Sequence, residues 1–319
     1  MWTVRSESGT LRAVLVQESI EQFWEKKFPF TGIESNTNLL ARSPHADIDG
    51  GREQWRQLSK YLEAEGVNVF EVTSILEKAL DSATLGERRR MVEHVWRDMP
   101  VAPKAEDLTV EHLLCGYPPR PYYDKGADRV VLPDFQRVGW PYPRDTSFTT
   151  QVGTVICNMK RYSRRFEPRV VKLAYEYDPI LSEKVDVIYD ANETQESLTE
   201  PPCIEGGDTH IVDEETIAVG LGQRSTHTGF MEAAKALFDR DPDEENDMEH
   251  LMTALMEQAR GASNIVTLKP GKIVAFARNH VTNGELRAHG IEVKEWEDSY
   301  LDMLGGPHCS TSPLLRDPV

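Results

Sequence analysis

Residues 273–293 read IVAFARNHVTNGELRAHGIEV, and this stretch decides the fold class. Its apolar start predicts a buried strand, the polar residues 278–283 predict a turn, and the residues up to Ala288 predict a helix. A second strand is expected at 291–293. The chain therefore contains a strand–turn–helix–strand unit, which is typical of α/β folds.

Residues 217–238 follow the same order, with a strand, a polar turn at 223–226 and a helix. A unit that recurs predicts pseudo-symmetric repetition of a small α/β module. A helix over 52–65, which stops at Gly66, fits the same alternation. Further strands are expected at 11–16, 67–72, 129–132, 154–157, 185–189 and 216–220.

The stretch 73–116 differs from the rest because its pattern is helical throughout. Its apolar positions recur at helical spacing; they are Ile75, Leu76, Leu80, Met91, Val95, Trp96, Leu108, Leu113 and Leu114. We interpret this stretch as a small helical insert in a single domain that spans residues 1–319. The acidic segment 239–247 has no apolar face and is expected to be a surface linker, followed by a helix over 248–260.

Composition limits the classes of partner. The 53 acidic and 36 basic residues give a net charge of −17, which disfavours nucleic acid and anionic membranes as partners. The sequence contains no run of 18 apolar residues, so no membrane span is expected. Residues 1–7 also lack a signal-peptide pattern. The cysteines are far apart in the sequence, which predicts no zinc site, no disulfide framework and a reducing cytoplasm. They are Cys115, Cys157, Cys203 and Cys309. Neither a metal nor a cofactor is expected.

The strongest chemical signal lies near the C-terminus, where residues 305–313 read GGPHCSTSP. The glycines allow backbone angles that other residues avoid, and Pro307 stiffens the approach to Cys309. Such a loop can hold a thiol in a pocket without a helix or strand covering it. An inert, buried cysteine is the alternative for this loop taken alone.

Three other motifs accompany this loop: PYPRDT at 141–146, CIEGGD at 203–208 and QRST at 223–226. Several ionised carboxylates in one pocket favour a planar cation with many donors, and a guanidinium matches carboxylates in bidentate pairs. A thiolate can attack the guanidinium carbon, and the release of ammonia needs a proton donor, usually a histidine. The motifs therefore predict a site made of a cysteine, a histidine and about three carboxylates.

In these motifs the chain resembles the arginine deiminases, which belong to a guanidine-modifying superfamily that includes the amidinotransferases. The resemblance implies that Asp145, in the place of the F-x-R-D aspartate, grips the substrate guanidinium, with Tyr142 at the aromatic position. Glu205 and Asp208 match the E-G-G-D motif, whose glutamate supports the catalytic centre and whose aspartate is expected at the substrate.

The resemblance extends to the nucleophile and to the substrate carboxylate. Cys309 in the Gly-Pro-His-Cys sequence resembles the family's nucleophile. Arg224 resembles an arginine that holds the substrate carboxylate, and Arg164 or Arg165 resembles a second. The helical stretch 73–116 resembles the helical domain of the arginine deiminases. The implied fold is a pentein-type α/β propeller of ββαβ modules.

One departure from the family is plain. The family carries an H-x-D motif between the E-G-G-D segment and the cysteine, and no such motif occurs there in this chain. One module is therefore expected to be incomplete. His250 starts an H-L-M-T sequence that resembles H-L-D-T, while the literal H-x-D is His45-Ala46-Asp47, outside the corresponding region. His210 and His308 lie nearer to the other motifs, and the acid–base group stays open.

The resemblance implies hydrolysis of L-arginine to L-citrulline and ammonia through a covalent thiouronium on Cys309. The expected partner is a small-molecule substrate in the cytoplasm, without nucleic acid or membrane, and a homo-oligomer stays open. Two alternatives stay open beside this activity. One is a catalytically impaired relative that binds arginine, because the H-x-D motif is missing. The other is transfer of the amidino group to an amine.

Overall fold

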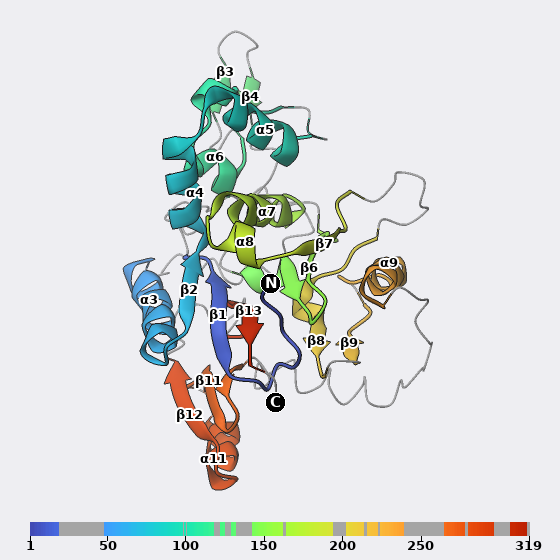
Figure 1. The fold of residues 1–319 in the computed structure, drawn as a ribbon. Helices are drawn as coiled ribbons and strands as arrows, with labels where there is room; N and C mark the ends of the chain where they lie inside the picture. The colour runs from blue at the N-terminus through green and yellow to red at the C-terminus, as the bar shows by residue number, and fades with distance from the viewer. Residues whose placement is uncertain are drawn as a thin grey trace.

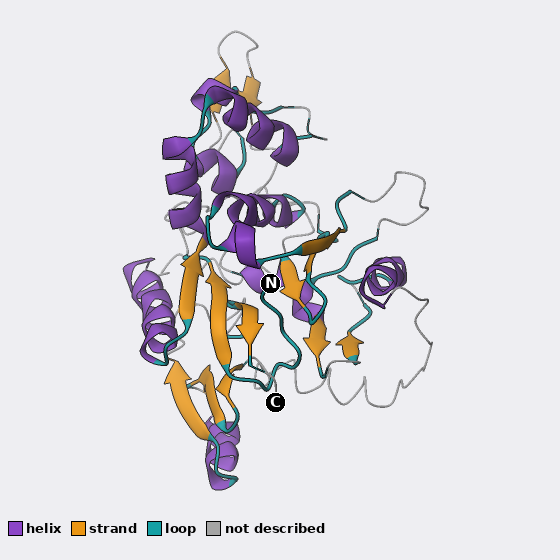
Figure 2. Cartoon of the chain, viewed as in Figure 1, coloured by secondary structure: helices purple, strands orange, loops and turns teal. Residues whose placement is uncertain are grey.

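The computed structural model describes residues 1–18, 48–97, 99, 101–117, 122–124, 129–131, 142–161, 164–193, 202–213, 216–222, 224–238, 265–277, 280–296 and 307–317. Helices and small sheets alternate along these segments (Figures 1 and 2). The helices are α3 (Ile48–Ala64), α4 (Val72–Ser82), α5 (Leu85–Val95), α6 (Val110–Cys115), α7 (Glu167–Tyr177), α8 (Leu181–Lys184), α9 (His227–Phe238) and α11 (His280–Ala288). The predicted α/β class is confirmed.

Within the described segments, the strands form five small sheets. They are β1 (Leu11–Val16), β2 (Asn68–Glu71), β3 (Tyr122–Asp124), β4 (Arg129–Val131), β5 (Ser147–Thr149), β6 (Thr154–Ile156), β7 (Val187–Asp190), β8 (Thr209–Ile211), β9 (Ile217–Val219), β10 (Val266–Lys269), β11 (Lys272–Phe276), β12 (Glu292–Trp296) and β13 (Ser312–Arg316). The sheet orders are β13-β1-β2, β3-β4, β5-β6-β7, β8-β9 and β10-β11-β12.

Three of these sheets share one topology. In the β5-β6-β7 sheet an antiparallel pair is followed by α7 and then by a strand parallel to the second. The β10-β11-β12 sheet repeats this order with α11 as its helix. The β13-β1-β2 sheet does so as well, because β13 is antiparallel to β1 and β2 returns parallel to it after α3. The predicted repetition of a small α/β module is thus confirmed, whereas closure of the modules into a propeller stays a prediction.

Strand β1 lies between two hydrophobic cores. Ala13 and Leu15 belong to a core that β1 shares with the helices α4 to α7, while Val14 and Val16 belong to a core with α3 and β10 to β12. A strand buried on both faces is expected to be apolar throughout, as residues 11–16 nearly are. Its pairing with β13 brings the C-terminal segment back beside the N-terminal one (Figure 1).

The helices α4, α5 and α6 lie together at one end of the molecule, and α11 lies at the opposite end (Figure 1). Capping boxes start two of them: Thr84 forms one with Glu87 at α5, and Thr109 forms one with His112 at α6. Such caps satisfy backbone donors that a helix end otherwise leaves unpaired. These helices fall in the range 73–116, where the sequence predicts the helical insert, while the division into domains stays a prediction.

Several expected elements differ in their bounds, and α3 and β7 each begin two or more residues away from the expected start. Helix α3 begins at Ile48, four residues before the predicted start. Strand β7 begins at Val187 because Val185 still caps the short helix α8, with its amide bonded to the Leu181 carbonyl. The expected linker 239–247 and helix 248–260 lie outside the described residues.

Within the described segments, none of the helices has both the length and the apolar character that crossing a bilayer requires. The four cysteines all lie in these segments, and each carries a free thiol.

A histidine of α5 that contacts α7 should make stability depend on pH. Nε2 of His94 lies 3.1 Å from the Arg169 carbonyl oxygen, and burial, with the charge of Lys172, lowers the pKa of His94 to about 4. In the unfolded chain this imidazole takes up a proton near pH 6.5, so its stabilising effect is present above that pH and is lost as pH falls towards 4. We therefore expect His94→Gln to reduce the drop in unfolding free energy between pH 7 and pH 4.5 by about 1–2.5 kcal/mol.

Urea unfolding at the two pH values measures this effect. His289→Gln, at an exposed position after α11, is the matched control and should leave the pH dependence as in the parent chain. An unchanged pH dependence in His94→Gln would contradict the assignment.

Candidate active site

Asp145 is buried at the end of a short 3-10 turn, η3 (Pro143–Asp145), and is 6% exposed. Its Oδ2 accepts a hydrogen bond of 2.7 Å from Nη1 of Arg164. The other N–H groups of Arg164 face Glu167, at 2.8–3.1 Å. Arg164 is itself buried, so these two carboxylates neutralise its charge inside the protein.

The second acidic turn packs directly against the first. Glu205 precedes a 3-10 turn, η5 (Gly206–Asp208), and is 1% exposed. A Cβ on Gly206 would lie 2.3 Å from the Arg144 carbonyl oxygen, and one on Gly207 would lie 2.2 Å from Oδ1 of Asp145. The two glycines are therefore required because they let the two carboxylate-bearing turns approach one another.

A guanidinium group lies on both carboxylates. Nη1 of Arg224 donates a 2.9 Å hydrogen bond to Oε2 of Glu205 and lies 3.5 Å from Oδ2 of Asp145. Arg224 precedes α9, and its side chain is 40% exposed. The pair Asp145 and Glu205 thus accepts a planar cation that approaches from the more exposed side.

The two carboxyl groups differ in their pKa. Burial raises the pKa of Asp145, but the charges of Arg164 and Arg224 outweigh it and hold that pKa below its usual value. Burial and the negative charge of Asp145 raise the pKa of Glu205 above its usual value. Such a split is expected where two carboxylates share a site, because the ionised group disfavours ionisation of the other. Asp145 therefore supplies the fixed negative charge, and Glu205 takes up a proton more easily.

Cys309 lies in a turn that leads into β13. Its side chain is half-buried, and Thr311 closes the turn by donating from Oγ1 to the Pro307 carbonyl at 2.8 Å. Strand β13 contacts both η3 and β5, and Oγ of Ser312 donates to the Ser147 carbonyl at 3.1 Å. Burial raises the pKa of Tyr142, and a charge on Cys309 would raise it further. The thiol thus lies on the same side of the protein as the Asp145 turn.

The remaining predicted residues occupy different surroundings. Tyr142 is buried at the start of η3. Asp208 accepts a 2.7 Å hydrogen bond from Oγ of Ser225, and burial raises the pKa of Asp208. Nε of Arg165 donates to the Met159 carbonyl at 3.2 Å. Their roles toward a substrate stay predictions.

Some predicted residues lie outside the described part of the chain: His45, Asp47, Gln223, His250 and the glycines at 305 and 306.

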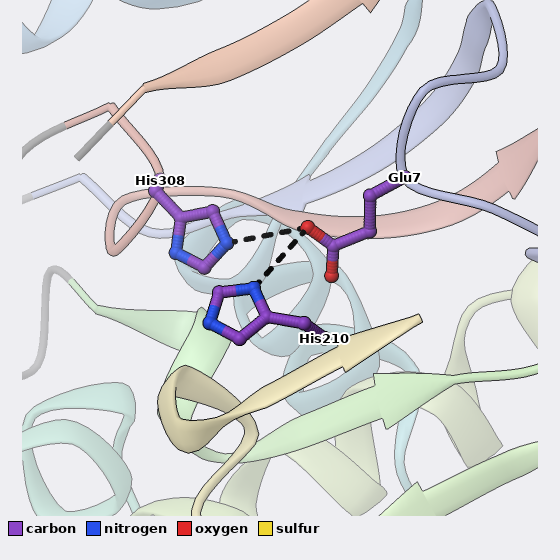
Figure 3. A group of neighbouring side chains, drawn as sticks. All are labelled: Glu7, His210 and His308. Atoms are coloured by element: carbon purple, nitrogen blue, oxygen red, sulfur yellow. Dashed lines mark ion pairs between the residues drawn. The ribbon is translucent and has the colours of Figure 1, made fainter. Parts of the chain in front are cut away.

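A second cluster lies beside this site and was not predicted from the sequence (Figure 3). Nε2 of His308 lies 3.5 Å from Oε2 of Glu7, and Nδ1 of His210 lies 3.8 Å from the same oxygen. The two imidazole rings stack with centroids 5.5 Å apart. Arg144 binds the other oxygen of Glu7. Burial, with the charge of Arg144, lowers the pKa of His308 to about 4.

Sequence reasoning overlooked Glu7, Arg144 and Glu167. Arg144 was within the 141–146 motif, where an Arg-Asp pair is usually a surface ion pair. The spacing of Arg164 and Glu167 is a usable signal, because residues three apart face one another on a helical turn. Glu7 has no such local signal.

Comparisons with known proteins place the sequence in a family. The family model described as arginine deiminase matches residues 139–250 and 245–316. The arginine deiminase of Streptococcus pyogenes is 22% identical over 419 alignment positions, which cover 99% of this chain and 98% of that protein. The arginine deiminase of Mycolicibacterium gilvum is 24% identical over 413 positions, which cover 98% of each chain.

Solved structures show the same fold. The amidinotransferase SxtG from Microseira wollei superimposes with a TM-score of 0.59 at 14% identity, over 100% of this chain and 98% of that one. A dimethylarginine dimethylaminohydrolase adduct superimposes with a TM-score of 0.55 at 11% identity, over 95% of this chain and 100% of that one. At such identities the likeness concerns the fold alone. Because the family model covers more than half of the sequence, the chain belongs to the arginine deiminase family.

Proposed function

We propose that this protein hydrolyses L-arginine to L-citrulline and ammonia, with Cys309 as the nucleophile. The observation that carries this proposal is that the guanidinium of Arg224 forms ion pairs with both Glu205 and Asp145. The substrate's reactive group is the same chemical group as this side chain, so two carboxylates that hold one guanidinium are suited to hold another. Family membership supports the same reaction class.

Two covalent steps account for the products. The Cys309 thiolate bonds to the guanidinium carbon, and once one nitrogen is protonated, the C–N bond breaks and ammonia leaves a thiouronium. Water then adds to the same carbon and gives up two protons, one that restores the proton used to expel ammonia and one that passes to ammonia or solvent, and the C–S bond breaks to give the ureido group of citrulline and the free thiolate. Asp145, ionised beside Arg164, would orient the guanidinium through both steps.

The opposite pKa shifts of Asp145 and Glu205 indicate which of the two carboxyl groups handles the proton in these steps. Glu205 has a raised pKa, so we assign it to orient or relay the proton at the reacting nitrogen. Tyr142 and Asp208 would complete the walls of the substrate site. We assign no histidine to this step, since the sequence holds no H-x-D motif between Asp208 and Cys309.

Arg224 would have two positions in this proposal. It lies where the substrate guanidinium would bind, so substrate must displace it. Its side chain is 40% exposed, which makes this displacement inexpensive. The freed guanidinium, together with Arg165, would then hold the substrate carboxylate. Arg164, which binds Asp145 and Glu167, would act on the substrate through Asp145.

The broader setting of this proposal also follows from the family. We propose that the ββαβ modules close into a propeller with one incomplete module, and that the enzyme acts in the cytoplasm on its small-molecule substrate. The three repeated sheets support the former, and the four free thiols support the latter.

The deciding experiment removes the thiol. Cys309→Ala should release no citrulline from arginine above the uncatalysed background, because no other group is proposed to form the covalent intermediate. The matched control is Cys115→Ala in α6, a free cysteine in the helical part, which should keep its activity. Equal citrulline release from the parent chain and Cys309→Ala would overturn the proposal.

Removing Arg224 should change substrate preference. Agmatine is arginine without its carboxylate, so it needs the guanidinium site but no carboxylate clamp. Arg224→Ala should therefore lower the ratio of kcat/KM for arginine to that for agmatine by about 10–100-fold, the value of a lost charge-assisted hydrogen bond. Arg287→Ala, at an exposed position in α11, is the control and should leave the ratio unchanged. An unchanged ratio in Arg224→Ala would show that another residue holds the substrate carboxylate.

Gly207→Ala tests the contact between the two acidic turns. The added methyl group would push the Asp145 carboxylate away from its position beside Arg164, and we expect kcat/KM for arginine to fall by about 100-fold or more. Gly284→Ala in α11 is the control because nothing lies within 4 Å of its added Cβ. Activity of Gly207→Ala near that of Gly284→Ala would show that this carboxylate need not be held in place.

The missing H-x-D motif favours one alternative, a relative that binds arginine and barely turns it over. Losing a general acid–base group typically costs about 10²–10⁴-fold in rate. Calorimetric binding of arginine without product would support this alternative. A new guanidine product in the presence of an acceptor amine would instead indicate amidino transfer.

A further inference from the structure

The cluster beside the candidate active site has the donor set of a transition-metal centre. Glu7, His210 and His308 each offer one donor atom, and the three atoms lie within 4.8 Å of one another. Both imidazoles approach the same carboxylate oxygen (Figure 3). Two imidazole nitrogens and one carboxylate oxygen are the ligands of many zinc sites that keep a fourth position open.

The spacing of the donor atoms is close to that between two ligands of one metal ion. Separations of 3.5 Å and 3.8 Å between imidazole nitrogen and Oε2 of Glu7 are longer than N–H···O hydrogen bonds, which span about 2.7–3.2 Å. Ligand atoms at 2.0–2.1 Å around a tetrahedral zinc lie about 3.3–3.4 Å apart. A small inward movement of His210, whose side chain is 52% exposed, would bring the three donors to that spacing.

The surroundings complete such a site. Arg144 holds the other oxygen of Glu7, which leaves Oε2 as a single donor and fixes the carboxylate, as outer groups commonly do for metal ligands. A cavity of about 190 Å³ lies beside the donors and is lined in part by Thr267 and Thr311. A fourth ligand, such as water, has room there.

The charge of the cavity selects the kind of ion. Arg144 and Arg316 also line it, and both guanidinium groups oppose a cation held by charge alone. Their N–H groups face protein acceptors, among them the Gly206, Gly9 and Thr267 carbonyls. An ion that bonds strongly to imidazole nitrogen is therefore favoured over Ca²⁺ or Mg²⁺, which prefer oxygen ligands.

We propose that Glu7, His210 and His308 bind one divalent first-row transition-metal ion of the zinc type. The ion would join three segments that are far apart in the sequence: the N-terminal segment before β1, strand β8 and the turn that carries Cys309. This inference does not depend on the proposed hydrolysis of arginine, because neither Asp145 nor Glu205 belongs to the donor set.

The test uses the full-length protein, freed of metal by a chelator, and Zn²⁺ as the probe. Calorimetric titration should show one saturable site per chain, and a melting curve should shift upward with Zn²⁺. Excess Mg²⁺ or Ca²⁺ should not compete. Co²⁺ in place of Zn²⁺ should give the visible absorption bands of a four- or five-coordinate centre.

Four variants distinguish this site from other zinc-binding groups. His210→Gln and Glu7→Gln should weaken Zn²⁺ binding by at least about 10–100-fold and abolish the melting shift. His289→Gln, a histidine outside the cluster, and Cys309→Ser, which removes the nearby thiol, should bind Zn²⁺ as the parent chain does. Because His210 is half-exposed, its replacement should leave the fold intact, as circular dichroism would show.

Several results would overturn the proposal. They are the absence of saturable Zn²⁺ binding to the parent chain, binding that survives both His210→Gln and Glu7→Gln, and binding that disappears in Cys309→Ser. Cys309→Ala tests the proposed hydrolysis, and Cys309→Ser tests the metal site. Loss of citrulline release in the first, with intact Zn²⁺ binding in the second, would show that the two sites are distinct.

Discussion

Mutual neutralisation of buried charges is the interaction on which the candidate site depends. Arg164 and Arg224 share the carboxylate of Asp145, and each binds a further glutamate, Glu167 or Glu205. Removing one member of the buried pairs that Arg164 forms with Asp145 and Glu167 should cost about 3–5 kcal/mol, because the other charge is left without a partner, whereas Arg224 is 40% exposed and costs less to displace. The network therefore holds the two acidic turns in place before any substrate arrives.

This network also explains why the two carboxylates can hold a cation, as the proposed function requires. Asp145 keeps its charge because two guanidinium groups face it, whereas Glu205 is more easily protonated because Asp145 lies beside it. A cation that replaces Arg224 would contact the same two carboxylates and neutralise their charge as Arg224 does. In the proposed function, preference for a guanidinium and the stability of the turns would thus have one physical cause.

Pairing of the chain's two ends connects this network with the second cluster. Strand β13 pairs with β1, so the turn that carries His308 and Cys309 lies beside the N-terminal segment that carries Glu7. His308 contacts Glu7, and its charged form would also lower the pKa of Asp145. An ion bound by the Glu7–His210–His308 cluster would act on the thiol's surroundings through the residue that precedes Cys309.

The sequence by itself determined the α/β class, the repeated unit, most strand positions and the motifs that carry Cys309, Asp145 and Glu205. These features are local, because hydrophobic periodicity and turn residues act over a few positions. Only the tertiary structure decided that Arg224 lies on Asp145 and Glu205, and that Glu7 meets His210 and His308. Such contacts join segments that are remote in the chain, and their energies depend on burial and on distances between charges, neither of which a local pattern contains.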